Sequence, residues 1–147
     1  MSTQLPSTTG LLPPEFVAFT ASPATEPFWD AAREHRLVVP RCRSCGTFRL
    51  PPAVFCWNCR SLDVEWIEHD GAGDLYSYTV IRHAVIPSMA DVLPIVVGVV
   101  ELPGTNGCRL IGDVIGCDPE SVHIGMPLLL DWYDVADGSV PCFRPRA

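Results

Sequence analysis

Two Cys-x-x-Cys pairs lie within residues 41–60, in the segments Arg41-Cys42-Arg43-Ser44-Cys45-Gly46 and Phe55-Cys56-Trp57-Asn58-Cys59-Arg60. Thiolates at positions i and i+3 converge on one ion, and two such pairs supply the four ligands of a structural Zn²⁺ site. The ten residues between the pairs are fewer than in many zinc ribbons, but two short strands can span them. The pattern therefore predicts a structural metal site at Cys42, Cys45, Cys56 and Cys59. Rubredoxin-type iron, two disulfides or a redox pair are the alternatives.

The residues around the cysteines predict a small ribbon. Residues 37–41 and 47–50 have strand character and flank the first pair, and Gly46 suits a tight turn that directs backbone N–H groups at a thiolate. Arg60 follows the second pair instead of glycine, which predicts a less tight second turn. A four-thiolate shell has no open position for water, so we expect the metal to stabilise the fold and not to react.

Before the ribbon, the sequence predicts one helix. Thr25-Glu26-Pro27 is typical of a helix start, with a capping hydroxyl, an early acid and a proline tolerated in the first turn. Phe28, Trp29 and Ala32 then share one face, together with His35, and the helix should end near residue 36. Residues 1–24 are expected to form a flexible leader whose apolar residues at 16, 17 and 19 are candidates to dock elsewhere.

After the ribbon, the pattern is almost entirely β. The predicted strands cover residues 64–68, 74–83, 95–102, 108–115, 127–135 and 142–144, with a strong hairpin turn at 103–107 and glycines at bulge or corner positions. We expect a mainly β protein: an N-terminal helix, a rubredoxin-like four-cysteine zinc ribbon and an OB-fold Greek-key β-barrel, with a sandwich as the alternative. The expected divisions are a leader at 1–24, helix plus ribbon at 25–63 and barrel at 64–147.

Composition narrows the cellular setting. The chain has 147 residues, 48% of them hydrophobic, and no apolar run reaches the ~18–20 residues of a membrane span. No secretion signal is visible. The odd number of cysteines, seven, and the paired spacing of four of them favour a reduced cytoplasm over a secreted disulfide scaffold. The net charge of -7 argues against non-specific nucleic-acid binding. We therefore expect a cytoplasmic protein with neither a membrane nor a nucleic acid as partner.

Two features are candidates for ligand or partner contact. Six of the ten arginines lie in residues 1–60, and aromatic residues lie among them, so this part could present a basic face to an anionic ligand or an acidic partner; ordinary surface solvation is the alternative. The loop at 84–93 carries several apolar residues, which suit either a protein contact or a plug over the barrel end. The candidate contact residues are Arg41, Arg43, Arg49, Trp57, Arg60, Ile86 and Met89.

No catalytic constellation is evident. Cys108, Cys117 and Cys142 lack ligand spacing and are expected in the core, and nothing pairs His83 with a nucleophile. A Gly-rich phosphate loop, a serine elbow and a paired acid motif are all missing from the sequence. The chain is therefore not expected to be catalytic alone.

The sequence resembles a family of small zinc-ribbon plus OB-fold proteins, formerly of unknown function, that are encoded beside thiolase-superfamily enzymes. The resemblance covers residues 25–147 and departs from the family at Arg60, where glycine is usual. It is carried by Phe28-Trp29, Cys42-x-x-Cys45-Gly46, Pro51-Pro52, Cys56-x-x-Cys59, the run from Gly73 through Asp74-Leu75-Tyr76-Ser77-Tyr78-Thr79 to Val80, Gly116-Cys117-Asp118-Pro119, Ile124-Gly125-Met126-Pro127 and Phe143-Arg144-Pro145.

The resemblance implies a non-catalytic accessory subunit. Members of the family accompany thiolases and thiolase-like aldolases, including those that shorten steroid side chains, and some are fused to hydratase domains. The partner would supply the lyase or acyltransferase chemistry on an acyl-CoA thioester in lipid or steroid metabolism, with CoA as a candidate shared ligand. A free-standing acyl-CoA-binding module is the alternative, and a single-stranded nucleic-acid-binding OB protein is a more distant one.

Overall fold

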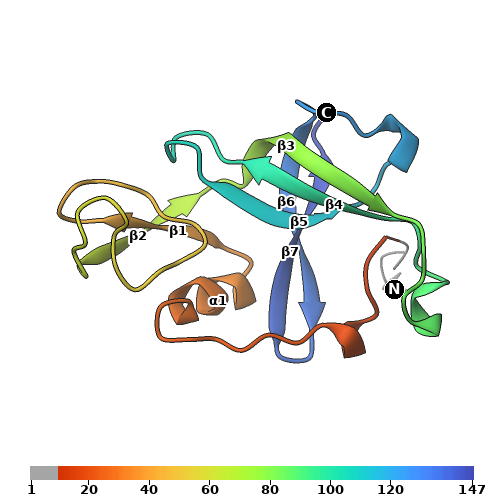
Figure 1. The fold of residues 1–147 in the computed structure, drawn as a ribbon, viewed down its shortest axis with the longest axis horizontal. Coiled ribbons are helices and arrows are strands. Elements are labelled where there is room, and N and C mark those ends of the chain that lie inside the picture. The colour runs from red at the N-terminus through yellow and green to blue at the C-terminus, as the bar shows by residue number, and fades with distance from the viewer. Residues whose placement is uncertain (1–9) are drawn as a thin grey trace, which may run out of the picture.

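The structure is a computed structural model that describes residues 10–147. One α-helix, three 3-10 turns and seven strands follow one another along this part of the chain (Figure 1). In chain order they are η1 (Pro14–Phe16), α1 (Glu26–Arg33), β1 (Leu37–Cys42), β2 (Val64–His69), β3 (Ala72–Ile81), η2 (Pro87–Met89), β4 (Ile95–Glu101), β5 (Arg109–Val114), η3 (Pro119–Ser121), β6 (Pro127–Val135) and β7 (Gly138–Pro145). In residues 10–147, no helix has the length and apolar character needed to cross a membrane.

Five strands form a closed barrel in the order β3-β4-β5-β7-β6. β6 pairs back onto the start of β3, and β5 and β7 meet in parallel at Asp113 and Val114. The other neighbours are antiparallel, and a register shift between Leu75 and Ser77 bends β3 where it changes partner. This topology confirms the predicted OB-fold barrel and not the alternative sandwich.

The barrel interior is filled by alternate apolar side chains, and glycines let two strands approach closely. A Cβ on Gly98 would lie 2.8 Å from Val114, and one on Gly112 would lie 2.9 Å from the carbonyl oxygen of Pro141. The core cluster includes Leu75, Val96, Val100, Leu102, Leu110, Val114, Leu128 and Phe143, and continues to Phe28, Leu37 and Val39 outside the barrel. One apolar core therefore joins the barrel, the helix and the first ribbon strand.

The ribbon differs from its prediction in how its strands pair. β1 pairs with β2 along its whole length, from Leu37 opposite His69 to Cys42 opposite Val64. Residues 47–50, predicted as a ribbon strand, make only an isolated bridge from Phe48 to Arg41, because a cysteine turn precedes this segment and prolines follow it. The expected boundary between ribbon and barrel at residue 64 remains a prediction. In the structure it would place β1 and β2, which are hydrogen-bonded to each other, in different domains.

Only two residues, Asp70 and Gly71, separate β2 from β3. The His69 side chain bridges this connection: its Nδ1 accepts a hydrogen bond from the Gly71 backbone at 3.0 Å, so its Nε2 donates to the carbonyl oxygen of Pro103 at 2.8 Å. Pro103 lies in the connection between β4 and β5. The ribbon is thus joined to the barrel by the chain and by one imidazole ring.

Helix α1 packs between β1 and the lower end of β7 (Figure 1). Of the predicted face, Phe28 and Ala32 are buried and Trp29 is partly buried, whereas His35 is exposed; Ala31, which was not predicted, is buried as well. Thr25 is the N-cap residue, but its hydroxyl does not cap the helix and instead accepts a hydrogen bond from the Ser22 backbone at 2.9 Å. The helix ends at Arg33, earlier than expected, because His35 adopts a φ of 57°.

The expected leader is described only from residue 10 onward, and residues 1–9 lie outside the described part. Within residues 10–24, the Gly10 backbone donates to the Val92 carbonyl at 2.9 Å and Leu11 packs with Ile115. The ring of Phe19 stacks on Trp29 at 4.2 Å. This part of the leader therefore lies along the barrel and the helix, which gives the predicted docking of Phe19 a definite site.

Candidate functional site

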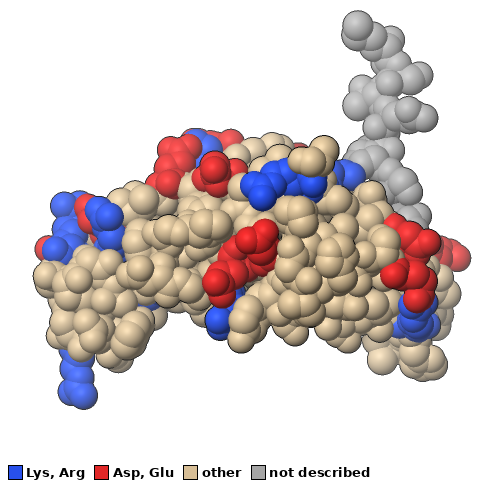
Figure 2. Space-filling model, turned by 90° about the horizontal axis from the view of Figure 1, so that it is seen from above, with Lys and Arg blue, Asp and Glu red and all other residues tan. Residues whose placement is uncertain are grey.

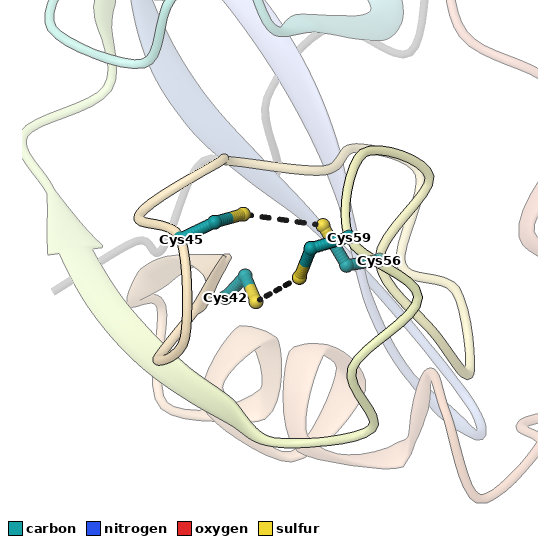
Figure 3. A group of neighbouring side chains, drawn as sticks. All are labelled: Cys42, Cys45, Cys56 and Cys59. Atoms are coloured by element: carbon teal, nitrogen blue, oxygen red, sulfur yellow. Dashed lines mark hydrogen bonds between the residues drawn. The ribbon is translucent and has the colours of Figure 1, made fainter.

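The four predicted cysteines meet at one point (Figure 3). Their sulfur atoms come from two loops and lie within 4.8 Å of one another, with Sγ–Sγ distances of 3.5 Å between Cys42 and Cys59 and 3.6 Å between Cys45 and Cys56. A disulfide would require about 2.05 Å, so none of the four is disulfide-bonded here. Four thiolates at about 2.3 Å from a tetrahedral Zn²⁺ lie about 3.8 Å apart, and the Cys42–Cys59 and Cys45–Cys56 distances are close to this value.

The two cysteine turns share the same backbone hydrogen bond and the same left-handed conformation at the residue after the second cysteine. The Gly46 backbone donates to the Cys42 carbonyl at 2.9 Å, and the Arg60 backbone donates to the Cys56 carbonyl at the same distance. Gly46 and Arg60 both have positive φ, 77° and 65°. The expectation of a less tight second turn is therefore wrong: Arg60 adopts the left-handed conformation, which costs a non-glycine residue roughly 1 kcal/mol.

The surroundings of Cys45 favour its thiolate form. The Thr47 hydroxyl lies 3.1 Å from the Cys45 sulfur, and the Asn58 amide donates to the same sulfur at 3.6 Å. Hydrogen bonds from Thr47, and then from Asn58, lower the pKa of Cys45 to about 6. A thiolate is the form that binds metal, so the hydrogen bonds at Cys45 suit a metal ligand at this position. With four thiolates as ligands, Zn²⁺ at this site would act structurally, because the shell is closed.

The arginine-rich face is mostly neutralised. Arg33, Arg36, Arg41 and Arg43 each pair with a carboxylate, for example Arg41 with Glu65 at 2.7 Å between β1 and β2. Figure 2 shows red and blue side chains beside one another on the face seen from above. The predicted contact role of Arg41 and Arg43 is untested, but these side chains carry their own counter-charges. Arg60 is exposed and has no ion pair with any residue from 10 to 147.

The other candidate contact residues differ in their exposure. Trp57 is 71% exposed, whereas Arg49 is only 4% exposed and lies between the ribbon and the barrel. In the loop at 84–93, Ile86 is exposed but Met89 is 6% exposed and packs with Val92 and Ile95. The Met89 side chain therefore belongs to the plug over the barrel end, and its contact role remains a prediction. Within this loop, Met89 covers the barrel end, whereas Ile86 forms part of an exposed apolar patch.

The three remaining cysteines are unsuited to nucleophilic chemistry. Cys142 is buried, and burial raises its pKa to about 12. Burial also raises the pKa of the partly buried Cys108 and Cys117. Because the reactive species is the thiolate, all three are protonated thiols at neutral pH.

The sequence interpretation missed an acid in an apolar cleft. Asp113 lines a cavity of about 490 Å³ between β5, helix α1 and the loop at Leu50, with Phe28 and Trp29 among its mostly apolar walls. Burial raises the pKa of Asp113 to about 6. The available signal was its place between Gly112 and Val114 in a predicted strand, where a charge on a core-facing stretch is unusual.

The comparisons with known proteins agree with this site and fold. The family domain described as "ChsH2, rubredoxin-like zinc ribbon domain" matches residues 29–65, and "ChsH2, C-terminal OB-fold domain" matches residues 66–132. A DUF35 domain-containing scaffold protein of Methanocaldococcus jannaschii is 35% identical over 100 residues, which are 67% of this chain and 69% of that protein. The chain belongs to this ChsH2/DUF35 family of zinc-ribbon and OB-fold proteins, which confirms the resemblance.

Two further relatives are parts of enzymes. A probable enoyl-CoA hydratase alpha subunit of Thermomonospora curvata is 42% identical over 120 residues, 80% of this chain, but the chain spans only 36% of that subunit. In the solved structure of the Ltp2-ChsH2(DUF35) aldolase, one chain superposes with a TM-score of 0.78 at 37% identity. The match covers 87% of this chain and 98% of that one.

Proposed function

We propose that this protein is a non-catalytic accessory subunit of a thiolase-superfamily aldolase or thiolase that acts on acyl-CoA thioesters. The observation that carries the proposal is the similarity to the ChsH2(DUF35) aldolase over 98% of that chain's length. Such coverage means that the whole fold, and not one module of it, is of the type found in an aldolase assembly. The partner supplies the catalytic residues.

The chemistry of the described residues supports a non-catalytic role. The cysteine cluster offers a closed ligand shell, and burial holds the other cysteines as protonated thiols. Asp113 is a titratable group in a cleft, but no cysteine, serine or histidine is among the described residues that line the cleft. The cysteines and the Asp113 cleft of residues 10–147 therefore suit binding and positioning better than acid–base or covalent catalysis.

Exposed apolar side chains support a partner surface. On the ribbon loop, Val54, Phe55 and Trp57 are 65%, 55% and 71% exposed, and Val85 and Ile86 are exposed on the barrel loop. Aromatic residues in such positions are typical anchors of protein interfaces. We assign partner contact to Trp57 and Ile86, and secondary contacts at the rim to Arg41, Arg43 and Arg60.

Co-expression with the thiolase-like protein encoded nearest to this chain tests the proposal. We expect one complex in size-exclusion chromatography and aldol cleavage or thiolysis of an acyl-CoA that depends on both chains. Trp57→Ser should weaken the complex at least tenfold, while Ile124→Ser, at an exposed apolar residue outside the ribbon, should not. Separate elution of the wild-type chains, with activity indifferent to this protein, would refute the proposal.

An enoyl-CoA hydratase is a second candidate partner. The specific observation is the 42% identity to a stretch of a probable hydratase alpha subunit, whose remaining length this chain does not cover. Offering both enzymes to the tagged chain in one mixture decides between them, because only the true partner should co-elute. A CoA thioester as shared ligand is tested by calorimetry of the chain and of the complex: heat with both would place part of the thioester site on this chain.

A further inference from the structure

The most unusual charged group in the described structure is the guanidinium of Arg49. Seven of the ten arginines form ion pairs with carboxylates, and Arg60 and Arg146 are exposed to water. Arg49 is neither paired nor exposed: 4% of its surface is accessible, and its Nε and Nη1 atoms have no hydrogen-bond partner among residues 10–147. Burying a cation without a partner is strongly unfavourable, so the position of Arg49 requires an explanation.

Arg49 lines a groove of about 360 Å³ between the ribbon and the barrel. The ribbon wall carries Phe55 and Trp57, and the opposite wall is the start of β5 with the turn before it, including Asn106 and Arg109. The position of Arg49 is held from behind, because its backbone donates to the Pro40 carbonyl of β1 at 3.0 Å. The backbone that carries the guanidinium is therefore attached to the first ribbon strand.

The charge of the groove is uncompensated. None of the described residues that line it is acidic. Its second arginine, Arg109, is already paired with Glu101 at 3.1 Å and lies 3.7 Å over the ring of Tyr76. The available cation is therefore Arg49, and Asn106 adds a polar side chain at the rim.

We propose that this groove binds an oxyanion, a carboxylate or phosphate group, as the counter-ion of Arg49. Guanidinium groups pair with both kinds of oxyanion through parallel N–H donors. Binding would relieve the cost of the unpaired buried cation, and the exposed Trp57 offers a flat apolar surface to the body that carries the anion. The site is a property of this chain alone, so it does not depend on the proposed subunit role.

Thermal unfolding of the full chain in the presence of inorganic phosphate or acetate tests the site, with the ionic strength held constant by sodium chloride. We expect a saturable rise in Tm for the wild type and for Arg146→Met, which removes an exposed positive charge. Arg49→Met should lose the response, with an apparent affinity at least tenfold weaker. In buffer without either oxyanion, Arg49→Met should be as stable as the wild type or more stable, because it removes an unpaired buried charge.

The two anions distinguish the source of the ligand group. A response to acetate alone identifies a carboxylate, as an aspartate or glutamate of another chain would supply. A response to phosphate identifies a phosphate group, as a nucleotide-like ligand would supply. A response of equal size in the wild type, Arg49→Met and Arg146→Met means an adventitious salt effect and overturns the proposal, as does the absence of any response.

Should Arg49→Met fail to fold, the wild type provides a direct reading. The Nε–H resonance of Arg49, assigned from its loss in Arg49→Lys, should shift saturably with the same anion and the same midpoint as the Tm. An unshifted resonance at saturating phosphate and acetate would overturn the proposal. Failure of the anion test leaves the complex with the enzyme subunit to be judged separately by co-elution.

Discussion

The ribbon (residues 37–69) and the barrel (residues 72–145) are of similar β character but bury different kinds of residue. Between residues 43 and 63 of the ribbon, Arg49 and Cys56 are the only buried residues. The barrel instead buries an apolar cluster that includes Leu75, Val100 and Phe143. A short segment without an apolar core must be stabilised by cross-links or metal, so one chain combines metal-linked and hydrophobic stabilisation.

The largest difference between the ribbon and the barrel is expected when a metal ligand is removed. Cys42→Ala removes one of four thiolates from a type of site whose binding free energy is about 10–16 kcal/mol. We expect about one zinc per wild-type chain and none in the variant, with fast amide exchange in residues 43–63 and retained protection in the barrel. Cys142→Ala, a buried cysteine outside the cluster, should keep its zinc. Zinc analysis and hydrogen exchange of the two variants provide the measurement. Unchanged amide protection of residues 43–63 in Cys42→Ala would contradict the prediction that metal stabilises the ribbon.

A core substitution should have the opposite pattern. Phe143 is completely buried in the barrel, so Phe143→Ala leaves a cavity and should lower the free energy of unfolding by about 3–5 kcal/mol. Zinc content of the folded variant should remain about one per chain, since the cysteine turns do not touch Phe143. Urea unfolding and metal analysis provide the measurement. Zinc loss under conditions where the barrel is still folded would show that the two regions are not separable.

Asp113, in the cleft that residues of both regions line, should make the free energy of unfolding depend on pH. Burial raises the pKa of Asp113 from 3.8 to about 6 in the folded chain. The folded state therefore holds the proton more tightly, so this group favours folding at low pH and its contribution is lost as pH rises from about 4 to about 6. The loss should be about 2 kcal/mol, allowing for partial solvation of the carboxyl. Asp113→Asn should abolish this part of the pH dependence in urea unfolding; identical pH profiles would argue against it.

The smallest effect is expected from the surface of the ribbon. Arg41 pairs with Glu65 across β1 and β2 at 2.7 Å, and both side chains are about one-third exposed. Exposed ion pairs contribute little, so Arg41→Met should change the free energy of unfolding by less than about 1 kcal/mol. A double-mutant cycle with Glu65→Gln measures the pair. A coupling of several kcal/mol would mean that the ribbon sheet depends on this ion pair as well as on metal.

The features that were predictable from the sequence depend on local spacing. The Cys-x-x-Cys pairs, the turn at 103–107 and the apolar strand composition of residues 95–102, 108–115 and 127–135 identified the ribbon and the barrel because each signal lies within one short segment. The pairing of β1 with β2 was not predictable in this way, because the two strands are separated by the whole cysteine loop. Residues 47–50 have an equally good strand composition and are nearer in sequence.

The candidate site was harder to predict because burial is a property of the tertiary structure. Arg49 and Arg43 look alike in the sequence, yet one is enclosed between ribbon and barrel and the other pairs with Asp63 at the surface. Met89 and Ile86 likewise belong to one apolar loop, and only the packing of Val92 and Ile95 distinguishes the plug from the patch. Only the metal ligands were identifiable from their spacing.

The His69 ring has a mechanical consequence. It ties the last residue of β2 to Gly71 and to Pro103, while the covalent connection to β3 is two residues long. A displacement of the β1–β2 sheet would therefore act on β3 and on the connection before β5 together, through the chain and through the ring. The short connection and the His69 ring together restrict how far the β1–β2 sheet can turn relative to the barrel.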